Sequence, residues 1–145
     1  MDHEDLQVND DSFESAAIAL VTEYQTARHA WEREAAAIKR RARNRPTPPE
    51  VLVAFDAKIA PFFVKPYSRP DRSYGDPPGV DPATTEFIGV TRRRGRIVVT
   101  TREIALPGFE VRANHEYILT EVDGRLRIAD IRAEVDPGTW VSLMR

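Results

Sequence analysis

The chain has 145 residues, of which 41% are hydrophobic and 30% charged, and its formal net charge is −2. This length favours one domain that buries roughly two thirds of its unfolded surface. Because the chain contains no cysteine, disulfides, thiolate metal sites and cysteine nucleophiles are excluded. No apolar run approaches the ~20 residues of a membrane-spanning helix, so we expect a cytoplasmic protein without a membrane partner.

The N-terminal segment is acidic, since every charged side chain before Arg28 is a carboxylate. The segment lacks the basic and apolar regions of a secretory signal. We expect residues 1–10 to be flexible, either as a solubilising tail or as a surface that associates rapidly with a basic partner. Residues 11–145 are expected to form the single domain.

A long amphipathic helix is predicted to begin at Asp11, with Glu14 completing a capping box. Its apolar residues recur at spacings of three and four, and they are Phe13, Ala17, Leu20, Tyr24, Ala27, Trp31, Ala35 and Ile38. No glycine or proline interrupts residues 12–45, so the helix could extend about 50 Å. The basic cluster at 39–45 complements the dipole at its C-terminal end.

A second helix is predicted to follow, with Thr47 as its cap, Pro48 at its first position and Glu50 reaching back to the cap. Its apolar positions are Val51, Leu52, Phe55 and Ile59. Pro61 ends it. The proline-rich passage from there to residue 82 is expected to be an ordered connector.

From Thr84 onward the apolar pattern has a period of two. We expect strands at 84–91 and 95–104 joined by a turn at Arg94–Gly95, with Val90 opposite Val99 and Ile88 opposite Thr101.

Gly89, inside the first of these strands, indicates a bend or a close approach of another backbone. The arginine run at 92–96 is then the exposed tip of a hairpin. The balanced net charge gives no general attraction for phosphate, so we expect no nucleic-acid partner.

Residues 115–135 predict a second hairpin around a type I′ turn at Asp123–Gly124. The apolar alternation continues to Ile128, but the next apolar residue is Ile131, on the other parity. This change predicts a bulge near Ala129–Asp130.

The bulge is expected to return Ile131, Ala133 and Val135 to the buried side, with Leu119 opposite Ile128 before it. The final TWVSLMR is expected to add a short edge strand. The predicted fold is therefore α+β, with N-terminal helices packed in a strongly curved antiparallel sheet of four to six strands.

Two segments carry a resemblance to a known family. The first is the hairpin EYILTEVDGRLRIADI, which has an aromatic-apolar strand, an acidic-glycine turn and then the strand Arg-Leu-Arg-Ile-Ala-Asp-Ile. This hairpin resembles that of the nuclear transport factor 2-like superfamily. The passage SYGDPPGVDPATTEFIGV and the late Trp140 are similar to the bacterial immunity proteins of that fold. The resemblance spans roughly residues 10–145. It implies a cone-shaped, cystatin-like sheet with a pocket at its wide end.

The resemblance also implies a function. Immunity proteins of polymorphic toxin systems bind and neutralise a cognate toxin, so we expect a non-enzymatic protein that occludes a toxin surface. The alternative is a small-molecule enzyme or ligand-binding protein of the isomerase, dehydratase or cyclase type, with polar groups inside the cone. Dimers through the sheet are common for this fold, and Arg125, Arg127 and Thr120 would lie on that face.

Tyr117 and Asp130 are the candidate catalytic residues under the alternative. The expected register places them opposite each other near the bulge, either as an acid/base pair or as a structural hydrogen bond. The candidates for a pocket lining are Tyr24, Phe55, Phe87, Tyr117 and Asp130. An inhibitor, in contrast, could fill the cone; the residues available for this are Leu119, Leu126, Ile128 and Phe55.

The three histidines, His3, His29 and His115, are scattered and show no metal-ligand spacing. His115 is the only one that we consider as a general base. No serine has a nucleophile-elbow context, and there is no glycine-rich phosphate loop. We therefore expect no metal and no cofactor.

Overall fold

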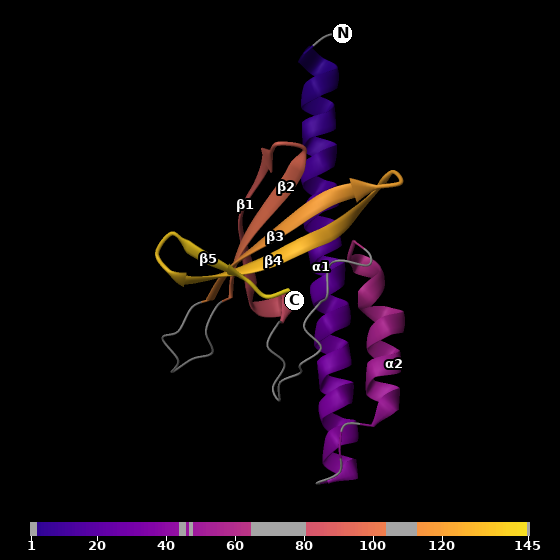
Figure 1. Cartoon of the computed structure of the whole chain (residues 1–145). Helices are drawn as coiled ribbons and strands as arrows, with labels where there is room; N and C mark the ends of the chain where they lie inside the picture. The colour runs from indigo at the N-terminus through magenta and orange to yellow at the C-terminus, as the bar shows by residue number, and fades with distance from the viewer. Residues whose placement is uncertain (1–2, 44–45, 47, 65–80, 104–112, 145) are drawn as a thin grey trace.

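The computed structural model describes residues 3–43, 46, 48–64, 81–103 and 113–144. The fold is α+β: a long N-terminal helix lies against an antiparallel sheet of five strands (Figure 1). The helical segments are α1 (His3–Ala42), α2 (Pro49–Lys58) and the short 3-10 helices η1 (Ala60–Phe62) and η2 (Pro82–Thr84). The strands are β1 (Thr85–Arg93), β2 (Arg96–Glu103), β3 (Ala113–Val122), β4 (Arg125–Asp136) and β5 (Thr139–Ser142).

The strands pair in chain order, so β1 and β5 are the two edges and the sheet is not closed. The expected edge strand at the C-terminus is thus confirmed as β5. Most of the proline-rich connector, residues 65–80, lies outside the described part of the chain. No described helix has a stretch long and apolar enough to cross a membrane.

Helix α1 starts earlier than the sequence predicted. It begins at His3, so Asp11 lies within the helix and the predicted cap is wrong. The reason is that residues 3–10 contain neither glycine nor proline, so no residue there breaks the helix. The helix ends as predicted in a basic turn, followed by Arg43 in the left-handed region with φ 53°. Flexibility of residues 1–10 stays a prediction.

Helix α2 begins one residue later than expected. Pro48 is its N-cap, in an extended conformation and without a side-chain hydrogen bond, and Pro49 occupies the first helical position. Thr47 lies outside the described residues. The indole Nε1 of Trp31 donates a hydrogen bond to the Val51 carbonyl at 2.9 Å, and this bond ties α2 to α1.

The core lies between α1 and the inner face of the sheet. From α1 it takes one stripe, which consists of Ala17, Val21, Tyr24, Trp31 and Ala35. From the sheet it takes Val99, Tyr117, Leu119, Ile128 and Ile131. Helix α2 and the residues after it add Val51, Phe55, Ile59 and Phe63. Four of these five helical residues belong to the predicted apolar stripe, whereas Val21 is buried although the predicted stripe did not include it.

The predicted bulge in β4 is confirmed. Leu119 pairs with Ile128, but Ile118 pairs with Asp130, so Ala129 is an extra residue. This extra residue returns Ile131 to the inner face, where 6% of it is exposed. The bulge therefore explains the change of parity in the sequence.

The same prediction was wrong for Val135, which is 58% exposed. A second irregularity against β5, between Glu134 and Asp136, leaves Val135 without a partner and turns it outward. Strand β4 thus bends at two places along its length.

The hairpin of β1 and β2 has the predicted turn. Val90 pairs with Val99 as expected, but Thr101 pairs with Phe87 and not with Ile88, because the register shifts between Phe87 and Gly89. Gly89 therefore belongs to a bend. No described atom outside its chain neighbours lies within 4 Å of where its Cβ would be, so the described residues show no close approach on that side.

In both of these hairpin turns the two central residues, the second of which is glycine, have backbone angles in the left-handed region. The φ angles are 49° and 78° at Arg94–Gly95 and 52° and 80° at Asp123–Gly124. Positive φ at both central residues is the type I′ geometry, which matches the right-handed twist of paired strands.

Gly124→Ala is predicted to lower the free energy of unfolding by about 1–2 kcal/mol, because a side chain at positive φ is strained. Gly89→Ala is the matched control, since its backbone is outside the left-handed region and its surroundings are open. The control should change stability by less than about 0.5 kcal/mol. Urea denaturation measures both, and equal losses would contradict the turn assignment.

Candidate functional site

Tyr117 and Asp130 do not form the predicted pair. Tyr117 pairs with Ile131, and Asp130 pairs with Ile118, so their side chains lie on opposite faces of the sheet. The reason is the bulge itself: without Ala129 as an extra residue, a regular register would have set Asp130 opposite Tyr117.

Asp130 is a structural residue on the outer face. Its Oδ1 accepts a hydrogen bond from the Ser142 hydroxyl at 2.6 Å. Its Oδ2 lies 3.0 Å from Nε of Arg132. The first contact connects β4 to the edge strand β5, and the second lies within β4. Together they use both carboxylate oxygens, so Asp130 is not part of an inner site.

Tyr117 faces α1 and is buried. Its hydroxyl accepts a hydrogen bond from Nε2 of Gln25 at 3.2 Å. Burial, and secondarily the neighbouring Tyr24, raise the pKa of the Tyr117 phenol far above its ordinary value. Gln25 was missed by the sequence analysis; the available signal was a polar residue four positions after Val21, on the buried side of the helix.

The aromatic pocket candidates are mostly core. The ring of Tyr24 contacts those of Phe62, Phe63 and Tyr117 edge-on, with centroids 5.9, 5.5 and 5.9 Å away. Phe55 is fully buried. These geometries are the preferred ones for packed aromatic pairs.

Phe55 and Phe87 also pack against core residues. Phe55 packs against Trp31 at a centroid distance of 4.8 Å. Phe87 is partly buried against the core, opposite Thr101. The apolar half of the interior is therefore filled.

The other half of the interior is polar. Thr101 and His115 are direct cross-strand partners on the inner face, next to Tyr117 along β3. Three buried atoms here have no hydrogen-bond partner in the described part of the chain: Gln25 Oε1, Thr101 Oγ1 and His115 Nδ1. Buried polar atoms are usually satisfied by protein or water, so these atoms mark the interior position best able to receive a polar group.

The ionisation of this polar half follows from its burial. Burial lowers the pKa of His115, which favours the neutral imidazole. Burial also raises the pKa of Glu103. The hydrogen bond that its carboxylate accepts from the Thr85 hydroxyl at 2.9 Å acts in the opposite direction. Arg28 and Glu32 are both buried and form an ion pair, in which Nε of Arg28 lies 3.6 Å from Oε2 of Glu32.

No group of three histidine or acidic side chains among the described residues could hold a metal ion. In this interior region the neutral imidazole of His115 can take part in hydrogen bonding and proton exchange.

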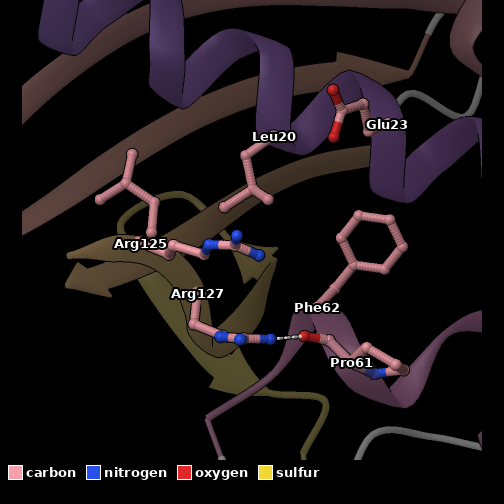
Figure 2. Close-up of a pocket in the computed structure, with 7 residues that line it drawn as sticks. Leu20, Glu23, Pro61, Phe62, Arg125 and Arg127 are labelled. Carbon is pink, nitrogen blue, oxygen red and sulfur yellow. Dashed lines mark hydrogen bonds between the residues drawn. The ribbon is translucent and has the colours of Figure 1, made fainter. Parts of the chain in front are cut away.

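Two hollows open on the surface near the tip of the β3–β4 hairpin. The first, called here the helix-side hollow, has a volume of about 250 Å³ and lies between α1, η1 and β4 (Figure 2). Its lining consists of Leu20, Glu23, Pro61, Phe62, Arg125, Leu126 and Arg127. Arg127 donates a hydrogen bond to the carbonyl of Pro61 across this hollow (Figure 2).

The second, called here the hairpin hollow, has a volume of about 300 Å³ and lies between the tips of the two hairpins. Its lining consists of Arg92, Gly95, Arg96, Ile97, Leu119, Thr120, Glu121 and Leu126. Leu126 therefore belongs to both hollows. The guanidinium of Arg92 lies 4.2 Å from the ring centroid of Phe13, which places α1 beside this hairpin.

No protein-family model, curated protein or solved structure matches the chain. The functional assignment therefore depends on the geometry of these sites and on the sequence resemblance.

Tyr117→Phe is predicted to lower the free energy of unfolding by about 1–3 kcal/mol, because the buried amide of Gln25 loses its partner. Adding Gln25→Met should recover most of this loss, because neither polar group is then left unsatisfied. A double-mutant cycle by chemical denaturation measures the coupling. Additive losses would show that the two side chains do not depend on each other.

His115 should make the protein less stable in mild acid. Its folded pKa lies below the unfolded value near 6.5, so the unfolded chain binds the proton more readily and stability falls as the pH drops through that value. Between about pH 7.5 and about pH 5.5, the wild type should lose more free energy of unfolding than His115→Gln. Equal losses would mean that the imidazole is not desolvated.

Proposed function

We propose that this chain is a binding protein of the bacterial immunity type, with a nuclear transport factor 2-like fold, that neutralises a cognate toxin in the cytoplasm by direct association. The resemblance of the hairpin and of the proline-rich passage supports the assignment to the immunity type. The packed interior and the surface hollows supply the physical support for binding without catalysis.

One observation carries the proposal: the aromatic and aliphatic residues that could have walled a pocket instead pack against one another. Tyr24 is 4% exposed, and Phe55, Leu119 and Ile128 are completely buried. A pocket enzyme needs open space beside its acid and base. The two surface hollows lie at the edge of this packed region, with Leu119 in the wall of one and Phe62 in the wall of the other.

The mechanism is occlusion. A toxin surface that normally meets its substrate would be covered by the immunity protein, and no bond would be made or broken. Arginine and aromatic side chains contribute strongly to protein interfaces because they combine apolar contact with directional hydrogen bonds. Arg96, Arg125 and Phe62 are such side chains at the two hollows.

A second candidate function has one observation in its favour. Gln25, Thr101 and His115 each have a buried polar atom without a partner among the described residues. Thr101 and His115 are cross-strand neighbours, and Gln25 bonds to Tyr117, two residues after His115. A small polar ligand or substrate that entered there would find a neutral histidine beside a hydroxyl. In that case the chain would be a small-molecule enzyme or ligand-binding protein.

The experiment that separates the two functions is capture of the tagged chain from its native cells, followed by mass spectrometry of the intact complexes. The proposal predicts one protein partner at fixed stoichiometry that survives dilution and is toxic when expressed without this chain. A homo-oligomer that carries extra small-molecule mass would contradict it. Thr101→Val separates the two functions as well, because loss of its hydroxyl should abolish ligand binding in the polar interior but should leave capture of a protein partner unchanged.

A further inference from the structure

We propose that the two hollows and the exposed arginines around them, together called the hairpin-end surface, bind an acidic protein segment with an apolar anchor residue. This inference rests on the proposed function and assigns the binding surface and the chemistry of the partner. Three observations support it: the positive charge of this surface, the apolar floor of the hollows and their small volume.

The charge at this end of the sheet is strongly positive. Residues 92–97 contain four arginines, and residues 119–127 contain two arginines and two carboxylates, Glu121 and Asp123. Arg94, Arg96 and Arg125 are exposed and make no ion pair with any described residue. Their guanidinium groups are therefore available for carboxylates, which they can hold through two parallel hydrogen bonds.

The floor of both hollows is apolar. Leu126 lines both of them, with Ile97 and Leu119 on one side. Leu20 and Phe62 lie on the other side. An inserted leucine or phenylalanine would bury apolar area against this floor, and such contacts stabilise interfaces more than exposed ion pairs do.

The size of the hollows favours side chains of a protein over a free small molecule. Their volumes are about 250 and 300 Å³. Ligand pockets commonly hold roughly 300–1,000 Å³, so each hollow is at or below the small end of that range. Two adjacent small hollows fit two neighbouring anchor residues of one segment.

The surroundings favour an acidic protein over a nucleic acid. Helix α1 passes beside the β1–β2 hairpin (Figure 1), and its described charges before Arg28 are Glu14 and Glu23, called here the acidic ridge. Glu23 lines the helix-side hollow itself. A nucleic acid, with one charge about every 1.7 Å along a duplex, would meet this acidic ridge. A short segment can reach the arginines and leave the ridge uncovered.

The test uses the full chain and a fluorescein-labelled peptide of alternating glutamate and leucine, followed by fluorescence anisotropy. The matched variants are Arg96→Glu with Arg125→Glu at the hairpin end, and Arg33→Glu with Arg43→Glu on exposed positions of the C-terminal part of α1 and just after it. Both double variants change the net charge equally. Unchanged melting temperatures establish that both are folded.

We expect the peptide to bind the wild type, with an affinity about 10-fold lower at high than at low salt because the arginines are exposed. The hairpin-end variant should bind at least about 10-fold more weakly, and the control within about 2-fold of wild type. Leu126→Ala should also weaken binding, and a peptide with lysine in place of glutamate should not bind.

Equal binding by both double variants, or binding of the lysine peptide, would overturn the inference. Tighter binding of a duplex oligonucleotide that is lost in Arg96→Glu/Arg125→Glu would overturn it in favour of nucleic acid. A captured toxin whose affinity is unchanged by these two substitutions would refute the surface assignment and leave the proposed function intact. If no protein partner is captured, the proposed function fails, whatever the peptide result.

Discussion

The extra residue Ala129 decides which side chains of β4 face the helix. Before it, Ile128 lies on the inner face opposite Leu119; after it, Asp130 faces outward and Ile131 inward. A strand that bends there can follow the curvature needed to pack against α1. The buried stripe of α1 and the inner face of the sheet depend on this register, because a shift by one residue would send Ile131 outward.

The same register divides the interior into two parts. On one side, aromatic rings around Tyr24 and Trp31 pack edge-on against their neighbours. On the other side, Thr101 and His115 are neighbours across β2 and β3 with buried polar atoms that lack partners. The first part supports a rigid binding protein. The second is the place where the alternative, a small-molecule site, would have to operate.

Local patterns predicted much of the fold. The two glycine turns, the parity change at Ile131 and the spacing of the apolar stripe each depend on residues close together in the chain, where backbone geometry limits the choices. The start of α1 was wrong because a good cap at Asp11 does not stop a helix whose preceding residues also favour helix. Val135 was wrong because its exposure depends on the pairing with β5.

The candidate site was harder to predict. Tyr117 was singled out, but its partner Gln25 lies 92 positions earlier in the chain, and no local pattern connects them. A regular register sets Asp130 opposite Tyr117, but the bulge shifts the pairing by one residue, so Asp130 pairs with Ile118 instead. The surface hollows combine side chains from α1, η1 and two hairpins, so only the packed structure brings them together.

Hydrogen–deuterium exchange tests most directly whether a partner binds at the hairpin end and leaves the interior unchanged. The chain would be compared alone and in complex with a toxin captured from its native cells. Slower exchange confined to residues 92–97 and 119–127 and to η1 is the result expected for binding at the hairpin-end surface. Slower exchange centred on Thr101, His115 and α1 around Gln25, with none at the hairpin tips, would contradict it.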